Sequence, residues 1–368
     1  MLEGFTLTGG KGTKWRDIHI GGKYREGGGI LIELSSPTIK YNLIVDNEAI
    51  NKSGMDVTSA GGGAIRCGDG NPLILNNVIR GNQGLYGAGI VLNFSGGIIK
   101  NNIIYQNTGG GDYGGSGIWS YSNGSDPKIF ENNTIVENSS IGSGSFGGKG
   151  GALVVWSTTV TACNNIIWGN TQSTGEPIAV ISGTANVTFS DVEGGWSGEG
   201  NIDIYPTFAD TNLYLLTTSP CVDSGNSDPV YDDPEDPGNQ GFAQWPAQGG
   251  LRNDMGAYGG PLADLLPGTI ITGIQLVNGI PSGFNLEQNY PNPFNPSTKI
   301  FYSIPKSTFV KLKIYDIFGR EVKTLVNQFQ TAGSYSADFN GSTLSGGIYF
   351  YILQTDNYTA ARKMLLVE

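Results

Sequence analysis

Apolar and polar positions in the first half of the chain follow a short repeat. One hexapeptide occurs five times, with asparagine at both ends and isoleucine in the third position. Successive copies start 35, 25, 31 and 32 residues apart. The copies are NLIVDN at 42–47, NVIRGN at 77–82, NIIYQN at 102–107, NTIVEN at 133–138 and NIIWGN at 165–170. A short unit of variable length predicts one coil of a solenoid.

Each coil is predicted to consist of strands, because its apolar runs are short and rich in Val, Ile and Thr. A Gly-rich stretch and an apolar residue precede every hexapeptide, and these apolar residues are Ile30, Ile65, Ile90, Ile118 and Leu153. Stacked at ~4.8 Å, the third hexapeptide positions would form one internal column of Ile44, Ile79, Ile104, Ile135 and Ile167. GFTLTGG at 4–10 and SDVEGG at 190–195 are interpreted as an earlier and a last, degenerate copy.

The leading asparagines predict a structural ladder rather than a ligand site. Asparagine tolerates a left-handed backbone at a turn, and stacked amides can hydrogen-bond from coil to coil. The predicted ladder consists of Asn42, Asn77, Asn102, Asn133 and Asn165. Cys67 and Cys163 lie three coils apart, too far for a disulfide, and are expected to be small buried residues.

This Asn/Gly/Ile coil pattern resembles the right-handed parallel β-helix family over residues 1 to about 205. The resemblance implies an all-β solenoid and says little about activity. Because the chain opens inside a coil, we expect the β-helix to be truncated at its N-terminus, with residues upstream of Met1 missing.

A candidate binding face lies beside the loops that vary in length, which fall in one register of the repeat and therefore along one edge of a solenoid. Alternation in the adjacent strand turns Arg66, Asn93, Trp119, Tyr121 and Trp156 outward. Exposed aromatic rings would bind the C–H faces of a sugar, while Arg66, Asn93 and Glu33 would supply directional hydrogen bonds. The alternative is that the loops fold over these rings.

Catalysis is not indicated by any motif. β-Helix hydrolases of pectin-like polymers resemble one another in Asn-Thr-Asp, Asp-Asp, Gly-His-Gly and Arg-Ile-Lys motifs, and the one Asp-Asp here, at 232–233, lies outside the coils. Lyases of the family use Arg or Lys beside a carboxylate-bound calcium, whereas Arg66 has no acidic cluster in the predicted strands. A polysaccharide lyase or glycoside hydrolase remains the alternative to a binding protein.

The net charge of −11 is concentrated in residues 171–268, which contain 14 acidic residues and one basic residue, Arg252. Such a block repels phosphate, so we expect no nucleic-acid partner. SPCVDSGNSDPVYDDPEDPG at 219–238 and RNDMGAYGG at 252–260 resemble a segment that often closes secreted β-helices. We therefore expect residues 206–262 to cap the open end of the solenoid. Calcium is a possible cofactor there, because carboxylates are its preferred ligands. The candidate ligands are Asp223, Asp228, Asp232, Asp233, Asp236 and Asp254.

After a linker at 263–281, residues 282–368 show about seven short alternating runs separated by turn signals, which predicts a small antiparallel, Ig-like β-sandwich. FNLEQNYPNPFNPSTKI, LKIYDIFGREVKTL, AGSYSADFNGSTLSGGIYFYIL and KMLLV closely resemble the type A C-terminal sorting domain of the type IX secretion system. The resemblance implies recognition by the secretion translocon and its sorting machinery through Gly346, Gly347, Lys363 and Met364.

The resemblance also implies export by a Gram-negative bacterium, through the periplasm, to the outer-membrane surface or the extracellular space. No apolar run is long enough to span a membrane as a helix. We therefore predict a secreted or surface β-helix protein that binds a polysaccharide or another extended ligand. An adhesin or surface-structural protein without catalysis is the second alternative.

Overall fold

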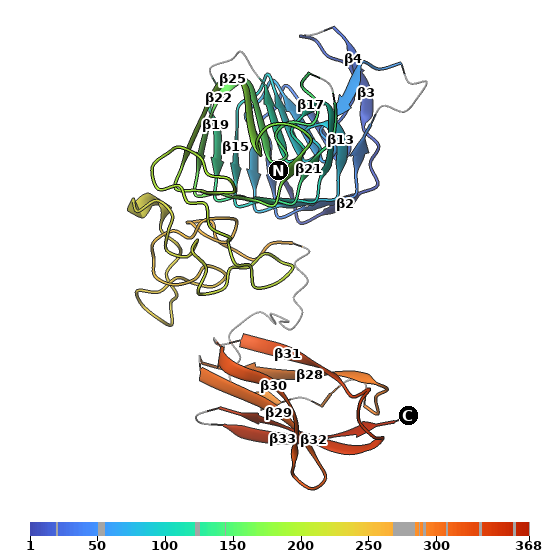
Figure 1. The fold of residues 1–368 in the computed structure, drawn as a ribbon, viewed down its shortest axis with the longest axis vertical. Coiled ribbons are helices and arrows are strands. Elements are labelled where there is room, and N and C mark those ends of the chain that lie inside the picture. Colours follow the sequence, from blue (N-terminus) through green and yellow to red (C-terminus); the bar gives the residue numbers. More distant parts are fainter. Residues whose placement is uncertain are drawn as a thin grey trace. The chain divides into compact units, whose positions relative to one another are not determined.

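The computed structural model describes residues 1–19, 21–50, 56–121, 126–143, 145–267, 284–286, 288–289, 292–306, 308–330, 333–355 and 358–367. They form two compact units, Met1–Thr269 and Ile270–Glu368. Most of the predicted linker at 263–281 lies outside the described residues. Figure 1 shows a stack of strands in the first unit and two antiparallel sheets in the second.

The first unit is a parallel β-helix whose coils contribute strands to three sheets. The 11-stranded sheet contains β1 (Leu2–Glu3), β5 (Ile30–Glu33), β6 (Thr38–Lys40), β10 (Ile65–Gly68), β11 (Leu73–Leu75), β14 (Ile90–Asn93), β15 (Gly97–Lys100), β18 (Ile118–Tyr121), β19 (Lys128–Glu131), β22 (Leu153–Cys163) and β25 (Ile178–Thr188). The 7-stranded sheet contains β2 (Thr6–Thr8), β7 (Leu43–Val45), β12 (Val78–Arg80), β16 (Ile103–Tyr105), β20 (Thr134–Val136), β23 (Ile166–Trp168) and β26 (Asp191–Val192).

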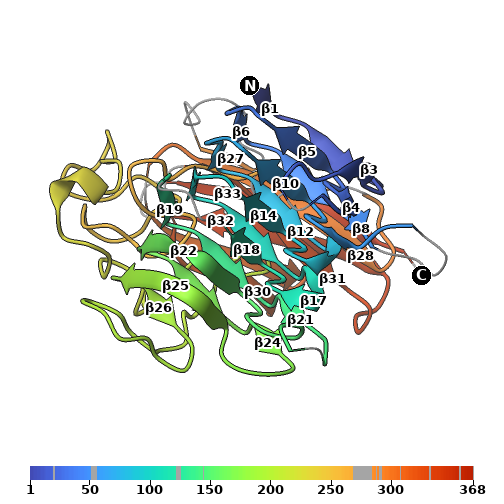
Figure 2. The same cartoon turned by 90° about the horizontal axis from the view of Figure 1, so that it is seen from above.

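The third, 8-stranded sheet borders the variable loops. It contains β3 (Thr13–Arg16), β4 (Lys23–Glu26), β8 (Glu48–Ala49), β9 (Ser59–Gly61), β13 (Gln83–Tyr86), β17 (Thr108–Gly114), β21 (Ser139–Ser140) and β24 (Thr171–Gln172). Viewed from above, β5, β10, β14, β18, β22 and β25 follow one another along the solenoid (Figure 2).

The predicted isoleucine column is confirmed. The five isoleucines are aligned in register from β7 to β23 and are essentially inaccessible to solvent. Leu7 of β2 and Val192 of β26 extend the column at its two ends, as expected for the partial copies. Ile65, Ile90 and Cys67 belong to the same core cluster. The alternating pattern therefore fixed the coil register.

Two asparagine ladders, rather than one, run along the coils. Asn77 Nδ2 donates to Asn102 Oδ1 at 3.0 Å, and the other predicted members repeat this bond. The closing asparagines make a second ladder in which Asn82 Nδ2 donates to Asn107 Oδ1 at 2.9 Å. The left-handed residue is not the ladder asparagine but the one before it, such as Asn101 with φ +54°.

The acidic segment does not cap the open end, which corrects the expectation for residues 206–262. It lies along the outer face of the 7-stranded sheet, beneath the coils in the view of Figure 1. Tyr214 and Tyr258 pack on Val78 and Ile103, which point away from the core of the coils. Because this outer face of the sheet is apolar, its exposure to water would be unfavourable, and the acidic segment covers it. At the end of the solenoid Trp196 packs against the core instead.

Side chains of the turns tether this acidic segment to the coils. Asn101 Nδ2 donates to the carbonyl oxygens of Ala257 and Gly259 at 3.1 and 2.6 Å. Asn132 Nδ2 donates to Asp254 O at 2.9 Å. Within the described residues the segment contains one short helix, the 3-10 turn η1 (Pro229–Tyr231). Irregular backbone can be buried here because side-chain amides satisfy its carbonyl groups.

The second unit is an antiparallel β-sandwich. One sheet contains β27 (Asn285–Leu286), β28 (Ser297–Ile304) and β31 (Gly333–Asn340), and the other contains β29 (Thr308–Asp316), β30 (Glu321–Gln330), β32 (Gly347–Gln354) and β33 (Thr359–Leu366). Their inner faces share one core, in which Ile300 and Tyr302 of β28 meet Leu312 of β29 and Tyr351 of β32. The all-β prediction, with a parallel solenoid followed by a sandwich, is confirmed.

Candidate functional site

A hairpin that leaves the coils covers part of the predicted binding face. β3 and β4 pair antiparallel, and β4 continues parallel to β9 of the next coil. The tip is held against the solenoid by His19, whose Nε2 lies 2.8 Å from Asp69 Oδ1 and whose ring stacks on Phe94. The hairpin thereby brings Asp17 and Glu26 over β10 and β14.

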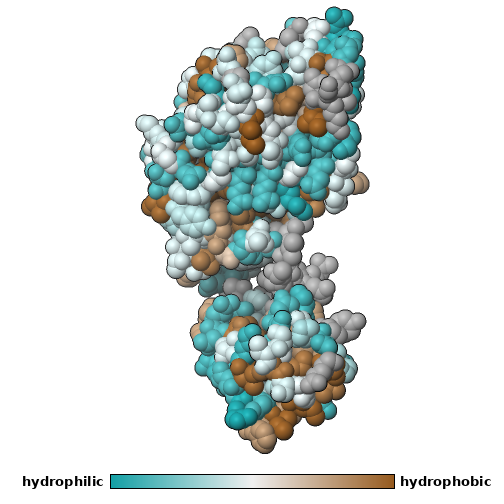
Figure 3. All heavy atoms as spheres, turned by 45° about the vertical axis from the view of Figure 1, so that its right-hand side comes forward, coloured by the Kyte–Doolittle hydropathy of each residue, from teal (hydrophilic) through white to brown (hydrophobic). Residues whose placement is uncertain are grey.

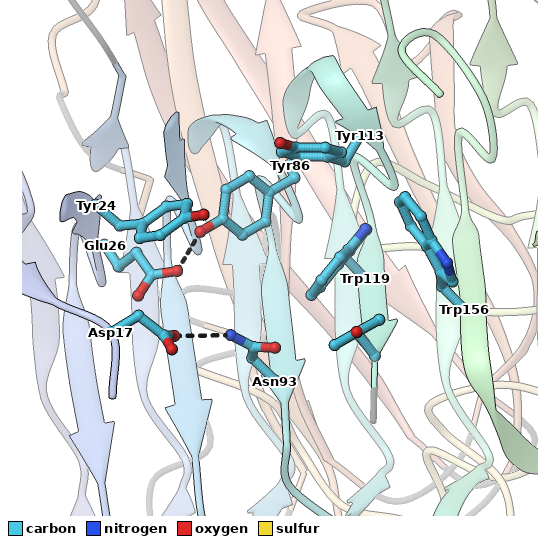
Figure 4. A pocket seen from close by; sticks show the side chains of 9 residues that line it. Asp17, Tyr24, Glu26, Tyr86, Asn93, Tyr113, Trp119 and Trp156 are labelled. Carbon is cyan, nitrogen blue, oxygen red and sulfur yellow. Dashed lines mark hydrogen bonds between the residues drawn. The ribbon is translucent and has the colours of Figure 1, made fainter. Parts of the chain in front are cut away.

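A pocket of about 180 Å³ opens between this hairpin and the outward-facing residues of the coils. Its lining combines six aromatic side chains with two carboxylates and one amide (Figure 4). The lining residues are Asp17, Tyr24, Glu26, Tyr86, Asn93, Tyr113, Trp119, Tyr121 and Trp156. Four of the five residues predicted from the outward register therefore line one pocket.

The aromatic residues form a contiguous wall rather than an exposed platform. Trp119 stacks on Tyr121 with ring centroids 5.6 Å apart, and Trp156 meets Trp119 edge-on at 6.4 Å. Tyr86 approaches Trp119 at 5.1 Å. Trp119 is only 7% exposed, so its predicted exposure is wrong. The rings of Tyr86, Tyr121 and Trp156 pack around it, since burial of aromatic surface is favourable. Tyr121 and Trp156 remain half-buried.

Arg66 is not an exposed ligand donor, which corrects its predicted role. Its guanidinium is buried behind the pocket among three carboxylates. Nε lies 3.0 Å from Glu26 Oε2, Nη2 lies 3.3 Å from Asp17 Oδ2, and Nη1 pairs with Glu33. The Trp15 ring stacks 4.5 Å from the guanidinium carbon. Arg66 therefore positions the pocket carboxylates from behind.

Glu26, like Asp17, is almost completely buried. It accepts hydrogen bonds from Trp15 Nε1 at 2.7 Å and from the Tyr86 hydroxyl. Burial raises the pKa of Glu26, although Arg66 and these two hydrogen bonds act in the opposite direction. Burial also raises the pKa of Tyr24 to about 12, so this phenol is neutral at physiological pH.

Two polar atoms of the wall have no hydrogen-bond partner among the described residues. Asn93 Nδ2 donates to Asp17 Oδ2 at 3.3 Å, which leaves Asn93 Oδ1 unpaired. The indole Nε1 of Trp119 is also unpaired. Buried polar groups are normally satisfied, and these two atoms, although almost inaccessible to solvent, lack a partner that a bound group could supply. The pocket offers aromatic faces, carboxylates, one amide oxygen and one indole N–H.

Sequence reasoning did not identify Asp17, Tyr24, Glu26, Tyr86 and Tyr113 as site residues. The first three come from the β3–β4 hairpin, and Tyr86 and Tyr113 come from strands β13 and β17, in the part of the coil that the repeat does not fix. A signal was present in TKWRDIHIGGKYRE at 13–26, where two alternating charged runs flank a Gly-Gly turn. That pattern is typical of a hairpin.

The six candidate calcium ligands do not form one site. No group of three metal-binding side chains is found in the described part of the chain. Asp254 accepts from the backbone N–H groups of Asp223 and Gln248 at 2.8 and 2.7 Å, and Asp233 accepts from that of Gly260. Asp228 and Asp236 accept from Val230 N and Gly238 N. These carboxylates hold irregular backbone in place. Asp232 precedes Asp233 and is partly exposed.

The predicted sorting residues differ in their surroundings. Lys363 is exposed on β33 opposite Phe350, whereas Met364 is fully buried in the sandwich core. Gly346 and Gly347 precede and begin β32. Apolar atoms gather on one face of this unit in Figure 3. Its exposed apolar residues include Phe309, Phe318, Phe329, Ile348 and Leu365.

Comparisons with known proteins agree with both folds. Residues 26–193 match the family model described as a right handed beta helix region, and residues 288–368 match the secretion system C-terminal sorting domain. The chain thus consists of a right-handed β-helix region followed by a type IX secretion sorting domain. A sorting domain directs a protein to the cell surface or the extracellular space and implies interaction with the secretion machinery.

A solved structure also resembles part of the chain. It is described as PorZ, an essential bacterial surface component of the type-IX secretion system of Porphyromonas gingivalis. The match has 18% identity, covers 25% of this chain and 13% of that chain, and has a TM-score of 0.18. A match of this size adds nothing to the fold described above. A search of the curated proteins found no significant match. Among the described residues, no helix is long and apolar enough to cross a bilayer.

Proposed function

We propose that this exported β-helix protein binds a polysaccharide through the aromatic pocket, which accommodates one sugar unit of the chain. The supporting observation is the pocket wall itself, in which Trp119, Tyr121 and Trp156 present ring faces beside polar groups. Stacking between a ring face and an apolar ligand surface is a common source of affinity in such sites.

The size of the pocket limits what it holds. Its volume of about 180 Å³ is close to the roughly 150 Å³ of a cavity that accepts one benzene molecule. One ring-sized group fits, whereas a longer chain would extend outside. The proposal is therefore recognition of a terminal or branching unit of the polysaccharide.

The test is saccharide binding by the full chain and by Trp156→Ala, on a glycan array and then by titration calorimetry. Trp156 is half-buried, so its replacement disturbs the fold less than that of Trp119. We expect at least a tenfold loss of affinity, since hot-spot aromatic residues contribute more than about 1.4 kcal/mol. Trp168→Ala is the matched control, because Trp168 is half-buried on the opposite sheet. Equal affinity of wild type and Trp156→Ala would contradict the proposal.

Hydrolysis of the bound sugar is the second candidate, favoured by one observation. Asp17 and Glu26 both line the pocket, and burial raises the pKa of Glu26. A carboxyl group with a raised pKa near a second carboxyl group is the usual pair of a glycoside hydrolase. New reducing ends, lost in Glu26→Gln, would establish this activity, and unsaturated products would indicate a lyase. Binding without products would leave a lectin-like module, and no binding would favour an adhesin or structural protein.

A further inference from the structure

We propose that the pocket selects a saccharide unit that carries an ammonium group, an amino sugar, over neutral and acidic sugars. This inference rests on the proposed function and specifies the ligand class of the same pocket. It is carried by the charge of the lining, the aromatic wall and the unpaired amide oxygen of Asn93.

The charge around the pocket favours a cation. Among the described residues that line the pocket, Asp17 and Glu26 are the only carboxylates, and none is a lysine, arginine or histidine. Behind them one cation, Arg66, faces three carboxylates, because Glu33 pairs with it as well. A ligand ammonium group would partly compensate this excess negative charge, whereas a uronate would be repelled. At short range in a partly buried site such interactions are large.

The aromatic wall has the same preference. The faces of tyrosine and tryptophan carry negative electrostatic potential and attract cations within about 6 Å of the ring centre. Six such rings surround a space of about 180 Å³. In Figure 4 the rings of Tyr24, Tyr86, Trp119 and Trp156 lie in a row above Asp17 and Asn93. An anionic group on a sugar gains nothing from these faces.

The unpaired atoms distinguish an amino sugar from a simple organic cation. Asn93 is 3% exposed, and its Oδ1 has no partner among the described residues. The bond to Asp17 fixes the amide so that Oδ1 points toward the side of the pocket where Trp119 lies (Figure 4). This oxygen needs a donor, which an ammonium supplies. The unpaired Trp119 Nε1 needs an acceptor, which a sugar hydroxyl supplies.

The experiment compares saccharides of equal length on the full chain by titration calorimetry. The probes are glucosamine oligomers, N-acetylglucosamine oligomers, cello-oligosaccharides and galacturonate oligomers. The first two differ at one position, which carries a charged ammonium group in glucosamine and a neutral acetamido group in N-acetylglucosamine. We expect glucosamine oligomers to bind at least tenfold more tightly than the acetylated and neutral probes, with the galacturonate probe weakest. Equal or tighter binding of a neutral or acidic probe would overturn the inference while leaving the proposed function intact.

Choline, a cation that is not a sugar, tests the preference for a cation separately from saccharide binding. If no saccharide binds but choline does, the cation site stands and the proposed saccharide function fails. If neither choline nor any saccharide binds, both are overturned. Asn93→Leu removes the amide oxygen while keeping the branched shape of the side chain, and should reduce the preference for glucosamine over cello-oligosaccharides about tenfold. Trp168→Ala should leave this ratio unchanged, and circular dichroism establishes that both variants fold. An unchanged ratio in Asn93→Leu would contradict the assignment of Oδ1.

Discussion

Two buried cations in the β-helix have opposite environments. Arg66 is surrounded by carboxylates and an indole ring, so its charge is compensated. Lys128, at the start of β19, is equally buried, but its Nζ has no hydrogen-bond partner within the described residues. Burial lowers the pKa of Lys128 to about 8, while the charge of Asp126 acts in the opposite direction. Lys128 is therefore a source of instability.

Replacing Lys128 by methionine should stabilise the β-helix at neutral pH. The ordinary pKa of 10.5 falls to about 8 on folding. The unfolded chain thus binds more protons between these values, and stability rises with pH in that window. At pH 7 the full penalty remains, and Lys128→Met should raise the free energy of unfolding by about 3 kcal/mol. Near pH 10 this gain should shrink.

Urea titrations followed by tryptophan fluorescence would measure this effect, because all six tryptophans lie in the first unit. Lys11→Met provides the control, since Lys11 is exposed and its ion pair with Glu48 lies at the surface. A gain that is equal at pH 7 and pH 10 would show that the charge of Lys128 carries no penalty.

In the turns between strands, two consecutive residues have different structural roles. The first residue of each pair adopts the left-handed conformation, and the second, an asparagine, joins the ladder. Asn101 and Asn132 occupy the first position and also hold the acidic segment. The same turn thus links neighbouring coils and attaches the segment that covers the 7-stranded sheet.

Removing one member of the ladder should destabilise the whole stack. Asn102 donates to Ile74 O, Lys100 O and Asn133 Oδ1 and accepts from Asn77. In Asn102→Ala these buried groups lose their hydrogen-bond partners, and each unsatisfied group lowers the free energy of unfolding by about 1–3 kcal/mol. We expect the free energy of unfolding to fall by about 3 kcal/mol or more in urea titrations. The control is Asn71→Ala at an exposed position. A loss no larger than in that control would rule out a structural role of the ladder.

At the scale of the whole molecule, the proposed binding pocket and the sorting domain belong to separate units. The pocket and all its lining residues lie in the first unit, and the match to the sorting domain lies in the second. Each unit has its own hydrophobic core. Variants that remove export should therefore leave ligand binding unchanged.

Deleting residues 282–368 should retain the protein in the periplasm while the β-helix stays folded, as measured by cell fractionation.

Two point variants separate recognition from folding of the sorting domain. Lys363→Ala changes an exposed side chain and should reduce export without changing thermal stability. Met364→Ala opens a cavity in the core and should lower stability by about 2–5 kcal/mol. Normal export of the deletion variant would show that this unit is not the export signal.

The sequence by itself determined the coils, their register and the identity of the second unit. These features depend on local periodicity, since every coil repeats the same alternation and the same turn. It also indicated that Asn93, Trp119, Tyr121 and Trp156 share one outward register. The sorting domain was evident because its motifs follow one another over the whole unit.

Only the tertiary structure decided what covers the outward faces. The β3–β4 hairpin folds over β10 and β14, converting a predicted platform into a pocket and burying Arg66 among carboxylates. The acidic segment likewise lies on the flank rather than the end of the coils. Neither placement follows from periodicity, because both depend on contacts between segments far apart in the chain, such as Asp17 with Asn93 and Asn101 with Gly259.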